Sequence, residues 1–333
     1  MELTFAAISE SLPGPKWQAF YEKHRSAYRK WFLSEGDAAR PSYRESARQL
    51  EQHMPELVPT YERLVELAGG SDIAARLLAL YCPPPYLTGC SQAVWPEARK
   101  QILVRNYDYS PKLTEGVLLR TEWNGRRVIA MSDCLWGVLD GMNDAGLVVS
   151  LAFGGRKVVG EGFGIPLVLR YVLEFCETTR EAVSALKRIP AHMAYNITVL
   201  DRRGSFKTVY VSPGKRPVVR HFPVATNHQG EVEWMEHAHA TATLERERFL
   251  ISRITDCGET PEGLADAFLR PPLFSHAYRK GYGTLYTAVY RPRECRLELR
   301  WQNGTWTHTF DAFQEGRWPV QYLDEGQHAA AGG

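Results

Sequence analysis

The pattern of apolar positions changes character near residue 85. Over residues 14–80 apolar side chains recur every three or four positions, which predicts amphipathic helices that pack against a core. Gly69-Gly70-Ser71 ends one of these helices, and residues 72–81 predict another. Cys82 is followed by three prolines, whose rings impose an extended segment. We therefore expect a helical N-terminal part that ends where this segment begins.

After residue 90 the chain is dominated by short apolar or β-branched runs between turn residues, which predict strands. The expected strands cover residues 116–121, 127–132, 146–153, 197–201, 208–211, 217–222, 283–290 and 296–301. Helical stretches interrupt them at residues 165–174 with 179–189, and at 240–255. Strands, helices and again strands in this order are typical of a layered α+β domain rather than of alternating βαβ units.

Charge and hydropathy narrow the classes of partner. With 40 basic and 38 acidic residues the chain has a net charge of +2, too little to indicate nucleic-acid binding. No apolar run approaches the roughly 18 residues of a membrane span. Residues 1–5 show no basic stretch followed by an apolar one, so a secretion signal is not expected. We expect a cytoplasmic protein with no nucleic-acid or membrane partner, and leave open whether it forms a homo-oligomer.

Cysteine usage bears on cofactors and on redox state. The chain has six cysteines, at Cys82, Cys90, Cys134, Cys176, Cys257 and Cys295. None forms a C-x-x-C pair, and the histidines show no metal-ligand spacing with them, so we expect neither a metal nor another cofactor. In a chain of this length without a secretion signal, six free thiols are expected rather than disulfides.

Cys90 precedes a turn signal at residues 96–100 that separates two strand-like runs. If the runs form a hairpin, antiparallel pairing puts residue 90 opposite about residue 106, with the thiol beside Arg105 and Asp108. A neighbouring cation favours the thiolate, which is the nucleophilic form of cysteine. A free cysteine is otherwise a small buried hydrophobe, and this interpretation stays open.

The spacing of the two charged residues constrains this geometry. Arg105 and Asp108 are three positions apart, so in a regular strand they point to opposite faces. Both reach Cys90 only if the strand ends or bulges near Tyr107.

The peptide bond before Cys90 is a candidate cleavage site. Gly89 has no side chain to shield its carbonyl. Attack by the Cys90 thiol would give an ester-like intermediate that water can open, which frees Cys90 as a new N-terminus. Its α-amino group, with an ordinary pKa of about 7.7–8.0, could then act as the general base for its own thiol.

Four motifs in order resemble those of N-terminal-nucleophile (Ntn) hydrolases. They are Gly89-Cys90-Ser91, Arg105-Asn106-Tyr107-Asp108, Asp140-Gly141-Met142-Asn143-Asp144-Ala145-Gly146-Leu147 and Ala225-Thr226-Asn227-His228. The chain is similar over about residues 86–301 to the branch that joins choloylglycine hydrolases, penicillin V acylases and the fungal isopenicillin N acyltransferase. The resemblance implies a four-layer αββα sandwich. It also implies a helical prosegment at residues 1–89 and a catalytic part at residues 90–333, whose tail we expect to be disordered from about residue 325.

The resemblance also implies roles for individual residues. Arg105 lies over the Cys90 thiol, and Asp108 hydrogen-bonds the freed α-amino group. Asn227 donates to the oxyanion, and the backbone N–H near Ala152 is the second donor, although choloylglycine hydrolases have asparagine there. Arg248 is a further active-site arginine, with Arg246 as its rival. Residues 141–146 are expected to form a tight turn with a structural role.

The function implied is that of a self-processing amide hydrolase that acts through an acyl-thioester on Cys90. An acyltransferase that moves an acyl group to an amine shares this intermediate and stays open, as does an uncleaved binding protein of the same fold. Trp95, Trp136 and Phe153 would line an apolar acyl pocket or belong to the core. Arg105 and Arg248 would offer bidentate donors to a carboxylate. The expected partner is therefore a small amide, an N-acyl amino acid or a short peptide-like molecule.

Overall fold

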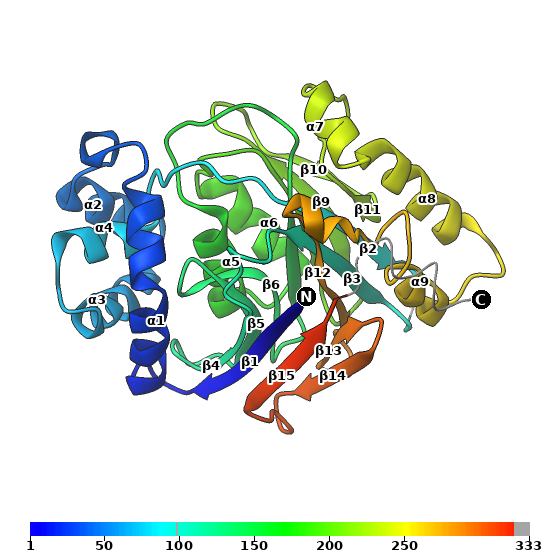
Figure 1. Ribbon diagram of the computed structural model, residues 1–333, viewed down its shortest axis with the longest axis horizontal. Helices are drawn as coiled ribbons and strands as arrows, with labels where there is room; N and C mark the ends of the chain where they lie inside the picture. Colours follow the sequence, from blue (N-terminus) through cyan, green and yellow to red (C-terminus); the bar gives the residue numbers. More distant parts are fainter. Residues whose placement is uncertain (98, 323–333) are drawn as a thin grey trace.

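The computed structural model describes residues 1–97 and 99–322, and within them two β-sheets pack against each other (Figure 1). The larger sheet has the order β10 (Val218–Arg220), β9 (Phe206–Val211), β8 (Tyr195–Leu200), β7 (Val148–Phe153), β6 (Gly137–Asn143), β5 (Val128–Asp133), β4 (Val117–Thr121), β1 (Glu2–Glu10) and β15 (Gly316–Gln321). The smaller sheet has the order β11 (Val224–Ala225), β2 (Gly89–Trp95), β3 (Ile102–Tyr109), β12 (Gly283–Arg291), β13 (Arg296–Trp301) and β14 (Gly304–Thr309). The tail predicted to be disordered lies outside the described residues.

Helices cover the outer faces of both sheets. Helices α5 (Ile165–Phe175) and α6 (Thr179–Arg188) pack on β6 and β9 of the larger sheet. Helix α8 (Thr243–Thr255) contacts β2 and β11 of the smaller sheet, and α9 (Pro261–Ala267) shares an apolar cluster with β3 through Leu264 and Val104. The layers therefore follow the order helix, sheet, sheet, helix, and the predicted α+β class is confirmed.

The N-terminal helices form a separate group at one end of the molecule, drawn in blue to cyan in Figure 1. They are α1 (Pro15–Phe32), α2 (Tyr43–His53), α3 (Val58–Leu67) and α4 (Asp72–Ala79), with short 3₁₀ turns at Asp37–Ala39 and Pro55–Leu57. Ser42 and Ser71 cap α2 and α4 by accepting from the third backbone N–H of each helix. The helices predicted over residues 14–80 are thus confirmed. None of the described helices has both the length and the apolar character that crossing a membrane requires.

Strand β1 was not expected, because the sequence interpretation assigned residues 1–89 to helix. The strand lies inside the larger sheet, parallel to β4 and antiparallel to β15. Its alternation of buried Phe5 and Ala7 with more exposed neighbours is the period-two signal of a half-buried strand. The first ten residues therefore belong to the same sheet as much of the segment after residue 90.

Further elements differ from the sequence prediction. Strand β6 was not predicted and runs to Asn143, so residues 141–143, which were expected to form part of a turn, are extended, and the turn lies between Asn143 and Leu147. Strands β14 and β15 were not predicted. The helix expected over residues 240–255 begins at Thr243 as α8, and a separate helix that was not predicted, α7 (Met235–Ala240), precedes it. Residues Ala277–Lys280 form a 3₁₀ turn before β12. The short apolar runs of β6 carry Gly141 and Asp140, which weaken the strand signal.

Candidate active site

The β2–β3 hairpin sets the positions of the candidate residues. Cys90 pairs with Tyr107, one position from the predicted register, and Gly89 pairs with Asp108. Strand alternation then puts Cys90, Arg105 and Tyr107 on the face toward the larger sheet. Ser91 and Asp108 lie on the other face, toward α8.

Strand β3 neither ends nor bulges near Tyr107, so the condition under which Arg105 and Asp108 would both reach the Cys90 thiol is not met. The strand pairs regularly with β2 up to Asp108, and the irregularity lies in the neighbouring β12, between Thr284 and Tyr286. Arg105 and Asp108 therefore act on opposite sides of one strand. Arg105 reaches the thiol, whereas Asp108 lies beside the backbone that precedes it.

The Cys90 thiol is fully buried between the sheets. Nη2 of Arg105 lies 3.2 Å from its sulfur, and the Thr88 hydroxyl lies 3.8 Å from it. Burial raises the pKa of Cys90, and the nearby Arg105 charge offsets this only in part. In the intact chain the thiol form is thus favoured, in contrast to the thiolate that the sequence indicated, because desolvation outweighs the single cation.

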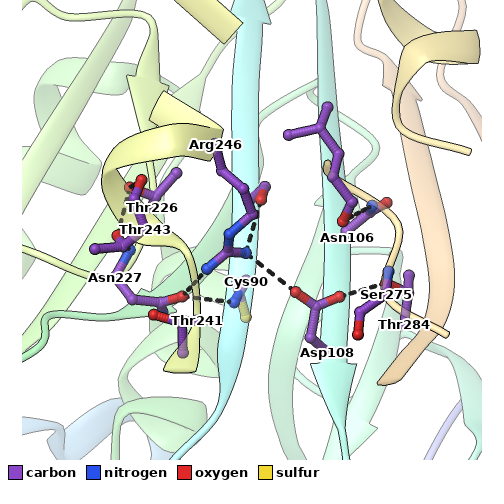
Figure 2. Close-up of polar contacts among 12 residues, drawn as sticks. Cys90, Asn106, Asp108, Thr226, Asn227, Thr241, Thr243, Arg246, Ser275 and Thr284 are labelled. Atoms are coloured by element: carbon purple, nitrogen blue, oxygen red, sulfur yellow. Dashed lines mark hydrogen bonds and ion pairs between the residues drawn. The ribbon is translucent and has the colours of Figure 1, made fainter. Parts of the chain in front are cut away.

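Arg246 organises the other face of the hairpin. Figure 2 shows its guanidinium between Asn227 and Asp108, close to Cys90. Its Nη1 donates to Asp108 Oδ2 at 3.1 Å and to the Ser91 hydroxyl at 2.9 Å, and its Nη2 donates to Asn227 Oδ1 at 2.7 Å. Burial still raises the pKa of Asp108, with Arg246 lowering it in part. The arginine holds a carboxylate and an amide on either side of the Gly89–Cys90 backbone.

Asn227 contacts the nitrogen of the candidate scissile bond. The Cys90 N–H donates to Asn227 Oδ1 at 3.1 Å. The Nδ2 of Asn227 donates to the carbonyl oxygens of Phe153 at 3.1 Å and Thr88 at 3.4 Å. The amide donors of Asn227 are therefore aimed at carbonyl oxygens around the bond. Ala152, one residue before Phe153, is buried in β7 opposite Asn196.

Gly89 has a steric reason to be glycine. A Cβ at this position would lie 1.4 Å from the Tyr282 hydroxyl and 3.2 Å from the Asp108 Cβ. No larger residue fits unless Tyr282 moves. Tyr282 was missed by the sequence interpretation, since a tyrosine between two glycines carries no signal of its own.

The arginine that faces the site is Arg246, and Arg248 does not. Arg246 is 3% exposed, whereas Arg248 is exposed on the outside of α8. Arg246 lies four positions before Leu250, which packs in the cluster between α8 and the smaller sheet. Residues four apart share a helix face. This periodicity was the signal that could have selected Arg246.

The three aromatic residues proposed for an acyl pocket are core residues. Trp95 packs with Leu250 in the layer between the smaller sheet and its helices. Trp136 is fully buried and donates to the Leu78 carbonyl at 2.9 Å. The ring of Phe153 packs edge-on against several aromatic rings, among them Tyr195. None of the three lines the cavity described next.

A cavity of about 940 Å³ opens beside Gly89, on the side of Asp108 and Arg246. Its walls come from the segment before Cys90, from α7–α8 and from the loop before β12. The lining residues are Leu87, Thr88, Gly89, Asp108, His237, Ala240, Thr241, Ala242, Arg246, Arg270, Pro271, Pro272, Leu273, Phe274, Ser275, His276, Ala277, Lys280, Tyr282 and Gln302. The apolar members form a wall, and the exposed Arg270 and Lys280 have no ion pair within residues 1–97 and 99–322.

We expect Arg246→Ala to lower the free energy of unfolding much more than Arg248→Ala does. Loss of Arg246 leaves the buried Asp108 without its counter-charge, which costs about 3–5 kcal/mol of unfolding free energy. Loss of the exposed Arg248 should change it by no more than about 0.5 kcal/mol. Urea unfolding of both variants checks this. Equal losses would mean that the Asp108–Arg246 pair is not the buried contact described above.

Several comparisons bear on the kind of protein this is. Solved structures that it resembles include a Caenorhabditis elegans N-acylethanolamine-hydrolyzing acid amidase ortholog, with 16% identity and a TM-score of 0.47 over 70% of this chain and 100% of that one. A penicillin V acylase from Agrobacterium tumefaciens has 15% identity and a TM-score of 0.46 over 67% and 86%. A conjugated bile acid hydrolase from Clostridium perfringens has 12% identity and a TM-score of 0.38 over 70% and 97%. No curated protein matches the sequence.

The family assignment rests on a sequence match over more than half of the chain. Residues 95–306 match the family described as acyl-coenzyme A:6-aminopenicillanic acid acyl-transferase. The match begins just after the Gly89-Cys90-Ser91 motif and spans the segments that carry Arg105, Asn227 and Arg246. The chain is therefore a member of the acyl-coenzyme A:6-aminopenicillanic acid acyl-transferase family, and so an enzyme of the Ntn type that hydrolyses amides or transfers acyl groups.

Proposed function

We propose that the chain cuts itself between Gly89 and Cys90 and then hydrolyses an amide bond of an N-acyl amino acid or a short peptide-like substrate. The observation that carries this proposal is the arrangement around one peptide bond. The Cys90 sulfur contacts Arg105, and the Cys90 nitrogen contacts Asn227, which Arg246 links to Asp108. Burying two arginines costs free energy, and a cysteine with only a packing role does not explain why Arg105 and Arg246 are buried around it.

The cleavage reaction follows from this arrangement. The Cys90 sulfur attacks the Gly89 carbonyl carbon, the C–N bond breaks, and the departing nitrogen takes up the proton that the thiol loses. Water then opens the thioester, which leaves a carboxylate at Gly89 and a free α-amine at Cys90. The raised pKa of the buried thiol explains why a base is needed for later turnovers, and the new amine is the nearest one.

Turnover uses the same groups on an external amide. The Cys90 α-amine accepts the thiol proton, and the sulfur attacks the substrate carbonyl. Asn227 and a backbone N–H near Ala152 donate to the oxyanion, and the amine returns its proton to the leaving nitrogen. Asp108 holds the α-amine in place, since it lies opposite Gly89 in the hairpin. Water releases the acyl group from the sulfur.

The two fragments should stay together after cleavage. Strand β1 is hydrogen-bonded on both edges, to β4 and to β15 of the second fragment. Trp17 of α1 is buried and donates to the Leu135 carbonyl at 3.0 Å. We therefore propose that the two chains formed by cleavage, residues 1–89 and residues 90–333, remain bound to each other as a permanent complex.

The cavity beside Gly89 supports a substrate with an apolar part and an anionic part. Leu87, Phe274 and the neighbouring prolines offer apolar wall, and Arg270 and Lys280 offer cations at its exposed side. This differs from the carboxylate clamp that the sequence suggested, because Arg105 is buried and paired with Asp140. Acyl transfer to an amine is the second candidate, since the matched family is described as an acyl-transferase.

Self-cleavage gives the first test. Denaturing mass spectrometry of freshly purified protein should show two chains, residues 1–89 and 90–333, which separate only in denaturant. Cys90→Ala should remain one chain and lack turnover. Cys176→Ala is the matched control. Cys176 is also buried, but it follows α5 and lies outside the β2–β3 hairpin, so this variant should be cut normally. One uncut chain in active wild-type protein would disprove the maturation step, and one uncut chain without turnover would favour an uncleaved binding protein.

Asn227→Ala tests the oxyanion assignment. The loss of one such donor lowers kcat by about 10²–10³, with a smaller effect on KM, because the bond strengthens mainly in the transition state. The comparison is made on protein whose processing has been verified by mass. A raised KM with an unchanged kcat would show that Asn227 only binds the substrate.

Arg270→Ala tests the anionic end of the substrate with a matched pair of compounds. For an N-acyl amino acid the variant should raise KM about tenfold, the value of one hydrogen bond to a charged group at its lower end. For the corresponding neutral amide the KM should not change between variant and wild type. Arg44→Ala, an exposed arginine on α2, is the control for loss of surface charge. Equal effects on both compounds would remove Arg270 from carboxylate recognition.

A further inference from the structure

Asp140 is a fully buried carboxylate with more partners than packing requires. It lies on β6 of the larger sheet, in the motif to which the sequence interpretation gave only a structural turn. Its Oδ2 forms an ion pair with Arg105 Nη1 and accepts from the Tyr286 hydroxyl at 2.6 Å. Its Oδ1 accepts from the Tyr290 hydroxyl at 2.5 Å. Three donors from the smaller sheet thus converge on one residue of the larger sheet.

The arginine that Asp140 pairs with is the one that contacts the thiol. Arg105 Nε donates to the Leu151 carbonyl at 3.2 Å, and Nη1 donates to the Tyr286 hydroxyl at 2.9 Å. The guanidinium also lies 4.9 Å from the centre of the Tyr107 ring. The remaining terminal nitrogen, Nη2, points at the Cys90 sulfur at 3.2 Å. The Arg105 guanidinium therefore links Asp140 to the sulfur of the candidate nucleophile.

We propose that Asp140 is a positioning residue that fixes Arg105 against the Cys90 sulfur and sets how much positive charge the sulfur experiences. The proposal rests on Cys90 being the nucleophile of the proposed function. An unpaired guanidinium would favour the thiolate strongly, whereas the ion pair with Asp140 cancels much of this effect. Tyr286 and Tyr290 in turn hold the carboxylate and draw part of its negative charge away from the site.

Other titratable groups lie close enough to the sulfur or to Arg105 to influence their charge, and they must stay unchanged in any test. They come from β3, β5 and β12 and from the residue before β12, and they are Tyr107, Asp108, Asp133, Tyr286 and Tyr282. Burial raises the pKa of Asp133 to about 6, and the Arg105 charge lowers it in part. The test therefore changes Asp140 and Tyr290 only, and compares the variants at each pH.

The electrostatic role predicts shifts of opposite sign. Asp140→Asn removes a negative charge, so the thiolate is less repelled and the pKa of Cys90 should fall by about one unit, the low end of neighbour-charge effects. Tyr290→Phe removes a donor from the carboxylate, which exposes the sulfur to more negative charge and should raise the same pKa by a smaller amount. A purely structural role would move both variants in one direction or neither.

The measurement is the pH dependence of Cys90 alkylation by iodoacetamide, located by peptide mass spectrometry. It needs no substrate, and intact mass reports cleavage separately, so failure of the proposed function is seen apart from failure of this inference. Glu174→Gln is the matched control, because Arg170 and Glu174 form another fully buried ion pair, within α5. It should leave the Cys90 profile unchanged.

Opposite shifts in the two variants support the positioning role. Unchanged profiles in folded Asp140→Asn and Tyr290→Phe protein overturn it, as do shifts of the same sign. If Asp140→Asn does not fold, Tyr290→Phe decides alone: an upward shift supports the role, and no shift or a downward shift overturns it. A shift in Glu174→Gln equal to that of Asp140→Asn would also overturn it, because the effect would then be a general result of breaking a buried ion pair.

Discussion

The buried guanidinium of Arg105 is the contact on which the candidate site depends. Its charge has left water, which costs several kcal/mol unless a counter-charge and hydrogen bonds offset the loss. Asp140 supplies the counter-charge and Leu151 an acceptor, both from the larger sheet, while Arg105 itself belongs to the smaller one. A shift between the sheets would break these bonds. The spacing of the sheets and the placement of the Cys90 sulfur are therefore linked through one side chain.

Strand β3 serves two chemical environments because its faces alternate. The face toward the larger sheet carries Arg105 to the thiol, and the face toward α8 carries Asp108 to Arg246. The backbone of the hairpin lies between them, so the sulfur and the carboxylate are separated although both belong to one site. This separation suits a reaction in which the sulfur attacks from one side while the nitrogen of Cys90 is handled on the other.

Desolvation is the strongest single influence on the titratable groups of the site. It raises the pKa of both Cys90 and Asp108 despite a cation beside each. The intact chain therefore stabilises a neutral thiol rather than an activated one. In the proposed mechanism the base that activates the thiol toward an external amide exists only after cleavage, which would restrict substrate turnover to the processed protein.

Much of this arrangement followed from local pattern. The β2–β3 hairpin was predicted within one residue of its register, because a turn of known length between two apolar runs determines which residues are opposite. The α+β class and the helices over residues 14–80 also followed from periodicity. Arg248 was taken from the family resemblance, with Arg246 as its rival, and the helical spacing to Leu250 that indicates Arg246 was not used.

Other features were decided only by tertiary structure. No local pattern shows that Asp140 would meet Arg105, because the two residues lie on different sheets and their pairing depends on how the sheets pack. The same holds for Tyr282, whose hydroxyl makes glycine necessary at position 89. The sequence by itself determined the elements and the hairpin, since these depend on neighbours along the chain. Contacts between layers, and with them the charge at Cys90 and the cavity beside it, depend on residues far apart in the chain and so appear only in the folded molecule.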